Sequence, residues 1–286
     1  MEGLRRCYML MSMLLVSSLI AGSLAGGLCG ASGAICNKLN LTTIAFAMAH
    51  GALAGAALAL ALNLDVLSAA MSMAIVTAIL LGPLADSLRI PLDLISMILF
   101  SAYNALTFIF ILLSPGPALM TERIGQLLWG SILAIRPSYI LILTILLIAY
   151  LSFIAVFWRR LSSMLFDLRL AEAEGINVRL YKCVLLTLIG ATIALSLRIT
   201  GGFLVFSLLY LPAAASLQLF STMKKLIAFS WIFGSISSSI GLWISLLSDL
   251  PVGSCIVIAA IILFLGSITY SRLRFKLSLR EAVNLV

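Results

Sequence analysis

The chain has 286 residues, of which 63% are hydrophobic and only 10% are charged. Soluble domains carry about 25% charged residues, so this composition excludes a soluble enzyme, a disordered chain and a nucleic-acid-binding protein. At about 20 residues per bilayer crossing, the apolar content supplies about nine transmembrane helices and leaves little for soluble domains. We therefore interpret the formal net charge of +8 as the Lys and Arg excess of cytoplasmic loops.

Nine apolar segments predict an all-α polytopic membrane protein of eight to ten helices, with residues 1–286 forming one transmembrane domain. The first segment follows Arg5 and Arg6 and could be a secretory signal. Because its apolar residues continue to Ile35 with no polar segment after them, we interpret it as a membrane helix. Residues 121–130 predict a further helix in the external interface. The nine segments are residues 8–35, 41–63, 65–85, 92–114, 137–158, 182–199, 201–219, 226–247 and 252–271.

Two basic segments predict the orientation of the chain. Residues 159–182 and the tail 272–286 are rich in Arg and Lys, so we expect both in the cytoplasm. This orientation places Arg5 and Arg6 outside, although basic residues beside a span usually lie in the cytoplasm. Either the first segment is an exception or the number of spans is off by one. Outside the two basic segments, the cytoplasmic basic residues are Lys38, Arg89, Lys224 and Lys225.

Ionisable residues within the spans are few, and each is a functional candidate because burying it in lipid is costly. His50, the only histidine, lies in the middle of segment 41–63. No Asp or Glu occupies the centre of a predicted span, which argues against an ion-coupled secondary transporter. A single histidine also cannot supply the ligands of an intramembrane metalloprotease. Two interpretations remain for His50: a packing residue bonded to a neighbouring helix, or a transient metal ligand on a translocation path.

Two further features involve glycine and proline residues within the apolar segments. Gly22, Gly26 and Gly30 recur at helical spacing, which predicts close helix packing. Gly201 and Gly202 precede an apolar stretch that loses a backbone hydrogen bond at Pro212. Broken helices line the pathways of many transporters, so residues 201–216 are a candidate pathway wall or gate.

The cytoplasmic loop 159–182 contains the pattern of a short helix. Asp167 is a good N-cap, residues 168–174 can form about two turns, and Gly175 suits the left-handed position that ends them. We expect this helix to lie parallel to the membrane, with Leu168, Ala171 and Glu172 as contact positions. The alternative is an ordinary surface turn.

Six short motifs occur in a fixed order between residues 49 and 253. Together they resemble the membrane permeases of ABC transporters that import zinc, manganese or iron. The motifs are Ala49-His50 before small residues, Asp93 with Phe100-Ser101, Leu128-Trp129-Gly130, Asp167-x3-Ala171-x3-Gly175, Gly202 to Pro212-Ala213-Ala214, and Asp249-x-Pro251-x-Gly253.

This resemblance implies a type II ABC importer-like permease in the cytoplasmic membrane that pairs with a second copy of itself. Each copy would bind one cytoplasmic ATPase and receive its metal from an extracytoplasmic metal-binding protein. Asp167, Ala171 and Gly175 would form the coupling helix that contacts the ATPase, and His50 would lie on the pathway. No Gly-Lys dipeptide occurs, so the chain has no phosphate-binding loop. We therefore expect a transport subunit that is not itself an enzyme and needs no cofactor.

One position departs from the family pattern. Permeases of this kind usually carry an Asp one helical turn before the histidine, where carboxylate and imidazole can meet one cation. Here that residue is Phe46. Either the pathway handles metal with fewer ligands, such as His50 with hydroxyls or a cysteine thiolate, or the substrate is a chelate or another small solute. An ATP-independent carrier or channel is the alternative from another class.

Overall fold

The computed structural model describes residues 2–114, 125, 128–130, 137–202 and 205–284, and the side chains of these residues except 2–12, 137, 275 and 277–284. Within these ranges the regular structure is entirely helical, as predicted. The helices are α1 (Glu2–Lys38), α2 (Thr42–Leu62), α3 (Val66–Leu88), α4 (Leu92–Leu113), α6 (Pro137–Val156), α7 (Trp158–Phe166), α8 (Leu168–Ala173), α9 (Val178–Thr200), α10 (Val205–Leu219), α11 (Met223–Ser248) and α12 (Val252–Asn284).

Each of the nine predicted spans corresponds to one helix. Among the described residues, eight helices are long and apolar enough to cross a membrane. The ninth, α10, has 15 residues and begins at Val205, later than the predicted start at residue 201. At about 1.5 Å per residue it is about 22 Å long, shorter than the bilayer core. The interfacial helix predicted at 121–130 lies mostly outside the described residues. The chain is thus a multi-pass membrane protein.

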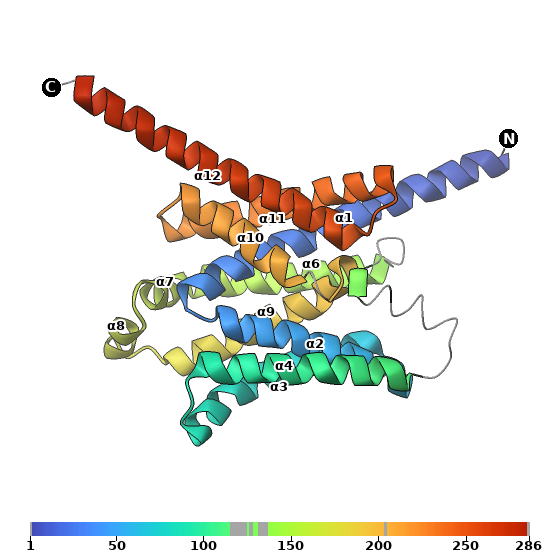
Figure 1. Ribbon diagram of the computed structural model, residues 1–286, viewed down its shortest axis with the longest axis horizontal. Helices are drawn as coiled ribbons and strands as arrows, with labels where there is room; N and C mark the ends of the chain where they lie inside the picture. The colour runs from blue at the N-terminus through green and yellow to red at the C-terminus, as the bar shows by residue number, and fades with distance from the viewer. Residues whose placement is uncertain (1, 115–124, 126–127, 131–136, 203–204, 285–286) are drawn as a thin grey trace.

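The helices run back and forth along the long axis of the molecule (Figure 1). Helices α7 and α8 and the C-terminus lie at one end, and the N-terminus lies at the other. The connections that carry Lys38, Arg89 and Lys224 are at the same end as α8, which agrees with the predicted cytoplasmic side. We call this the cytoplasmic end.

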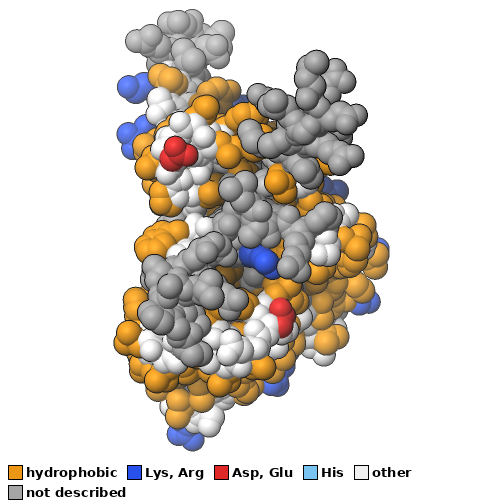
Figure 2. Space-filling model, turned by 90° about the vertical axis from the view of Figure 1, so that its right-hand side faces the viewer, with side chains coloured by type: hydrophobic (Ala, Val, Ile, Leu, Met, Phe, Trp, Pro, Cys, Tyr) orange, Lys and Arg blue, Asp and Glu red, His pale blue; other side chains and the backbone are white. Residues whose placement is uncertain are grey.

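Helices α2 and α9 form the centre of the bundle. Within their most apolar windows, 78% and 72% of the residues are buried, against 22% for α3, α4 and α6. The outer helices expose large apolar side chains, such as Ile79 and Leu80 of α3 and Ile145 and Ile148 of α6. Viewed from the end opposite α8, hydrophobic side chains cover most of the periphery (Figure 2). This apolar rim suits contact with lipid tails.

Glycines bring α1 into close contact with α10 and α11, which confirms the packing predicted from their spacing. A Cβ atom on Gly30 would lie 2.1 Å from the Ser230 carbonyl oxygen, and one on Gly234 would lie 2.0 Å from the Gly26 carbonyl oxygen. A Cβ on Gly33 would lie 1.7 Å from the Leu209 carbonyl oxygen. Helix backbones therefore touch at these points, as is common where small residues meet in membranes.

We expect Gly33→Leu to destabilise the fold strongly, because the new side chain must push α10 away from α1. Overpacking of this kind costs about 1–3 kcal/mol or more. The measurement is thermal unfolding of the purified protein in detergent. Gly82→Leu is the matched control, because a Cβ there meets no atom within 4 Å. Equal midpoints for the two variants would contradict the close packing of α1 on α10.

Candidate functional site

His50 lies in the middle of α2, and its side chain is only 3% exposed. Neither ring nitrogen has a hydrogen-bond partner of normal geometry, and Asn104 of α4 is the polar side chain that approaches it. Buried polar groups are nearly always hydrogen-bonded, and leaving one unpaired costs about 1–3 kcal/mol. The two interpretations of His50, a packing residue and a transient metal ligand, both stay predictions.

Three phenylalanine rings from three helices surround the imidazole. Phe46 lies one turn before His50 on α2, at 5.0 Å between ring centroids. The edge-to-face contact with Phe100 of α4 is closer, at 4.4 Å. Phe206 of α10 lies 6.0 Å from the imidazole and 5.0 Å from the Phe46 ring. The Phe46 and Phe100 rings are 4.6 Å apart, so all three rings contact one another or His50 directly.

Polar groups follow these rings toward the cytoplasmic end. The Thr43 hydroxyl donates to the Asp93 carboxylate at 2.6 Å and joins the starts of α2 and α4. The Tyr210 hydroxyl of α10 donates to the Thr42 carbonyl oxygen at 2.5 Å. The same three helices thus carry His50 with Phe100 beside it, then Phe46 and Phe206, and then the polar groups nearest the cytoplasmic end.

Within the described residues, no group of three His, Cys, Asp or Glu side chains could hold a metal ion. The Cys29 thiol donates to the Ser196 hydroxyl at 3.1 Å and is fully buried. A cysteine thiolate as a pathway ligand stays a prediction. One chain therefore offers a passing cation a single imidazole at this depth. A closed, permanent metal site needs about four ligands, so the arrangement suits transit better than storage.

Gly201 and Gly202 are positioned by packing. Gly201 ends α9 with φ of +83°, and a Cβ there would lie 2.3 Å from the Leu128 carbonyl oxygen. A Cβ on Gly202 would lie 2.2 Å from the Leu53 side chain. Pro212 lies inside α10 and is buried. Within residues 201–216, the side chain that lies against His50 is Phe206. The sequence analysis did not identify Phe206 as a site residue.

Helix α8 is capped as its sequence predicts. The Asp167 carboxylate accepts hydrogen bonds from the backbone N–H groups of Arg169 and Leu170, at 2.7 and 3.0 Å. These bonds lower the pKa of the Asp167 carboxyl, which keeps it charged at neutral pH. Gly175 has φ of +79°, and the N–H of Ile176 bonds back to the Ala171 carbonyl oxygen at 3.0 Å, which closes the helix. Ala171 is fully buried, so one face of α8 packs on the protein, and the prediction of Ala171 as a contact position for a partner is wrong.

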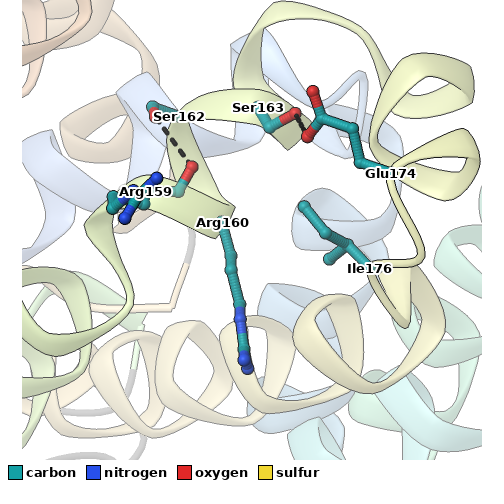
Figure 3. A pocket seen from close by; sticks show the side chains of 6 residues that line it. All are labelled: Arg159, Arg160, Ser162, Ser163, Glu174 and Ile176. Atoms are coloured by element: carbon teal, nitrogen blue, oxygen red, sulfur yellow. Dashed lines mark hydrogen bonds between the residues drawn. The ribbon is translucent and has the colours of Figure 1, made fainter.

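A second helix, α7, braces this element. Ser163 of α7 donates to the Glu174 carboxylate at 2.5 Å, and Arg160 donates to the Tyr181 hydroxyl of α9. Figure 3 shows Arg160, Ser163 and Glu174 among the side chains that line an open pocket of 610 Å³, with Ile176 below Glu174. The sequence carried a signal for α7, because the buried residues Leu161, Met164 and Leu165 have helical spacing. Helices α7, α8 and the start of α9 thus form one connected unit.

Comparison with known proteins gives this geometry a context. A model of the ABC 3 transport family matches residues 11–271. The chain belongs to this family. It is 29% identical over 264 residues to the manganese transport system membrane protein MntC of Listeria innocua, covering 92% of this chain and 91% of that protein. It is 28% identical over 223 residues to the high-affinity zinc uptake system membrane protein ZnuB of Haemophilus influenzae, covering 77% of this chain and 84% of that protein.

Two solved structures have the same fold as this ABC 3 family member. PsaBC from Streptococcus pneumoniae in complex with Fab matches with a TM-score of 0.79 at 28% identity, covering 91% of this chain and 95% of that one. An inward-facing metal-chelate type ABC transporter matches with a TM-score of 0.71 at 16% identity, covering 89% and 86% of the two chains. The second likeness supports the fold alone.

Proposed function

We propose that this chain is the membrane permease subunit of an ATP-driven importer that carries a divalent metal ion, such as manganese, zinc or iron, into the cytoplasm. Family membership and the manganese and zinc relatives support the class of substrate. The observation that carries the proposal is the imidazole of His50, which is buried in the middle of a span with no hydrogen bond of normal geometry at either nitrogen. Such a group can bind a divalent ion in transit.

A second copy of the chain completes the pathway in this proposal. The surface that α4 and α10 present beside His50 includes polar groups, with Ser101 exposed and Asn104 and Ser207 half-buried. Polar side chains in membrane helices usually face a protein interior or a water-filled path, because lipid cannot satisfy them. A second copy seated on this surface would enclose the path and supply a second imidazole.

A separate ATPase supplies the energy, and α8 with its caps Asp167 and Gly175 is the coupling helix that contacts it. This segment exposes apolar side chains toward the solvent: Phe166 is 80% exposed and Leu170 is 46% exposed. Exposed aromatic and aliphatic side chains on a rigid helix suit a groove on a soluble partner. An extracytoplasmic metal-binding protein delivers the ion at the opposite end.

Phe46 favours a second candidate substrate, a metal ion that travels with its own anionic ligands. The family resemblance places a carboxylate where Phe46 stands, and the rings around His50 carry no charge to balance a bare divalent ion. Moving an uncompensated charge into such surroundings is costly. A chelated ion would reduce that cost.

Reconstitution with the partner ATPase tests the function. Vesicles containing both proteins should accumulate manganese or zinc only with ATP, and more rapidly when the metal-binding protein is present. A matched set of assays with the chelated ion separates the two substrates. Uptake that is independent of ATP, or no ATPase contact in a pull-down, would refute the proposed function.

A further inference from the structure

The rings of Phe46, Phe100 and Phe206 lie between the imidazole and the surface of the chain. All three are half-buried, whereas His50 is 3% exposed, so the rings cover the imidazole. Each ring comes from a different helix, α2, α4 or α10. Their contacts are direct, with centroids 4.6 Å apart for Phe46 and Phe100 and 5.0 Å apart for Phe46 and Phe206. A ring contact of this length leaves no room for water between the faces.

The order of residues along the helices gives the depth of each ring relative to His50. In α2, Thr43 comes before Phe46, and Phe46 comes one turn before His50. In α4, Asp93 lies about two turns before Phe100. In α10, which runs toward the cytoplasmic end, Tyr210 follows Phe206 by one turn. Phe46 and Phe206 therefore lie between His50 and the polar layer of Thr43, Asp93 and Tyr210. Phe100 follows Asp93 by seven residues, as His50 follows Thr43, so its ring lies level with the imidazole and covers its side.

An apolar constriction of this kind blocks ions without a mechanical plug. A hydrated cation must shed water to enter it, and the rings offer no oxygen ligands in exchange, so the constriction stays dry and closed. A carboxylate at position 46, as the family resemblance leads one to expect, would bind water and cations at this level. Phe46 instead adds a third apolar ring.

We propose that Phe46, Phe100 and Phe206 form a hydrophobic seal that covers His50 at its own depth and on its cytoplasmic side. Because the rings come from three helices, a relative movement of α2, α4 and α10 opens the seal without unfolding any of them. The inference rests on the proposed function for the location of the pathway. The seal itself concerns any small ion, which allows a separate test.

The test measures leakage of K⁺, an ion that the importer is not proposed to carry. Vesicles contain the permease with its ATPase in the membrane and a K⁺ indicator trapped inside. Leakage is measured with and without ATP. Phe206→Ala removes a ring, and Phe46→Asp makes the layer polar. Both should increase leakage by about tenfold or more in at least one condition, because a widened or wetted constriction conducts. Phe46→Leu and Phe206→Leu stay apolar and should remain as tight as the native chain.

The matched control is Phe229→Ala, which disrupts a stacked pair with Phe220 at 4.0 Å that is separate from the His50 cluster. Size-exclusion profiles and ATPase binding establish that every variant is folded. Leakage confined to Phe206→Ala and Phe46→Asp supports the seal. Tight vesicles for both variants with and without ATP, or equal leakage with Phe229→Ala, overturn it. Loss of metal uptake by the native chain would instead count against the proposed function and would leave the K⁺ result interpretable.

Discussion

Asp167→Pro is expected to abolish ATP-driven uptake while leaving the chain inserted in the membrane. Asp167 has φ of −156°, which proline cannot adopt, and its backbone N–H bonds to the Ser163 carbonyl oxygen at 3.0 Å. Proline removes this bond and both cap bonds, so α8 loses its start and its fixed position on α7. An N-cap and a backbone bond are worth a few kcal/mol together, enough to disorder α8 and reduce uptake by more than about tenfold.

Asp167→Asn is the control for this prediction, because asparagine caps helices about as well as aspartate does. It should retain most of the uptake. ATPase binding is measured by pull-down with the same variants, and insertion by the amount of protein purified from the membrane. Normal uptake by Asp167→Pro would remove the coupling role from this segment.

Gly175→Trp tests the other end of the same helix. The positive φ of 79° strains any side chain, and a Cβ there meets no atom within 4 Å, so the indole would project into the space where the ATPase is proposed to bind. Gly266→Trp, at an equally open position on α12, controls for the size of the new side chain. Only Gly175→Trp is expected to lose ATPase binding and uptake.

The helices were predictable from the sequence because apolar length alone determines which segments cross a membrane. Helix ends were harder. The predicted third span ended at residue 85, whereas α3 continues to Leu88 and contains Pro83. Membrane helices tolerate internal prolines because neighbouring groups re-satisfy the freed backbone. At the start of α3, Asp65 accepts a hydrogen bond from the Ser68 N–H at 2.8 Å, a cap that the sequence indicated only as a charged helix end.

The candidate site was only partly predictable. Helical spacing places Phe46 and His50 on one face of α2, which the sequence shows directly. That Phe100 and Phe206 lie on the same imidazole depends on how α4 and α10 pack against α2, and residues so distant in sequence carry no local signal of contact. The role of Gly201 was not predictable either. A glycine that is required by a close backbone contact cannot be distinguished in the sequence from a glycine that acts as a flexible hinge.

His50→Ala is expected to reduce ATP-driven metal uptake by about tenfold or more, as loss of a metal ligand typically does. Folding should be little affected, for a reason specific to this site. Neither buried nitrogen of the imidazole has a hydrogen bond of normal geometry, and removing them relieves a desolvation cost that offsets the cavity left among the three rings. The measurements are uptake of manganese and zinc in vesicles and thermal unfolding in detergent.

His50→Leu keeps the volume and apolar contacts of the side chain but cannot bind metal, so it separates packing from ligation. If His50 is a ligand, both variants lose uptake and both unfold near the native temperature. If His50 only fills space among Phe46, Phe100 and Phe206, His50→Leu retains native uptake. The second outcome would leave the pathway without any ionisable group at this depth within the described residues of α2, α4 and α10, and metal would then have to cross by another face of the chain.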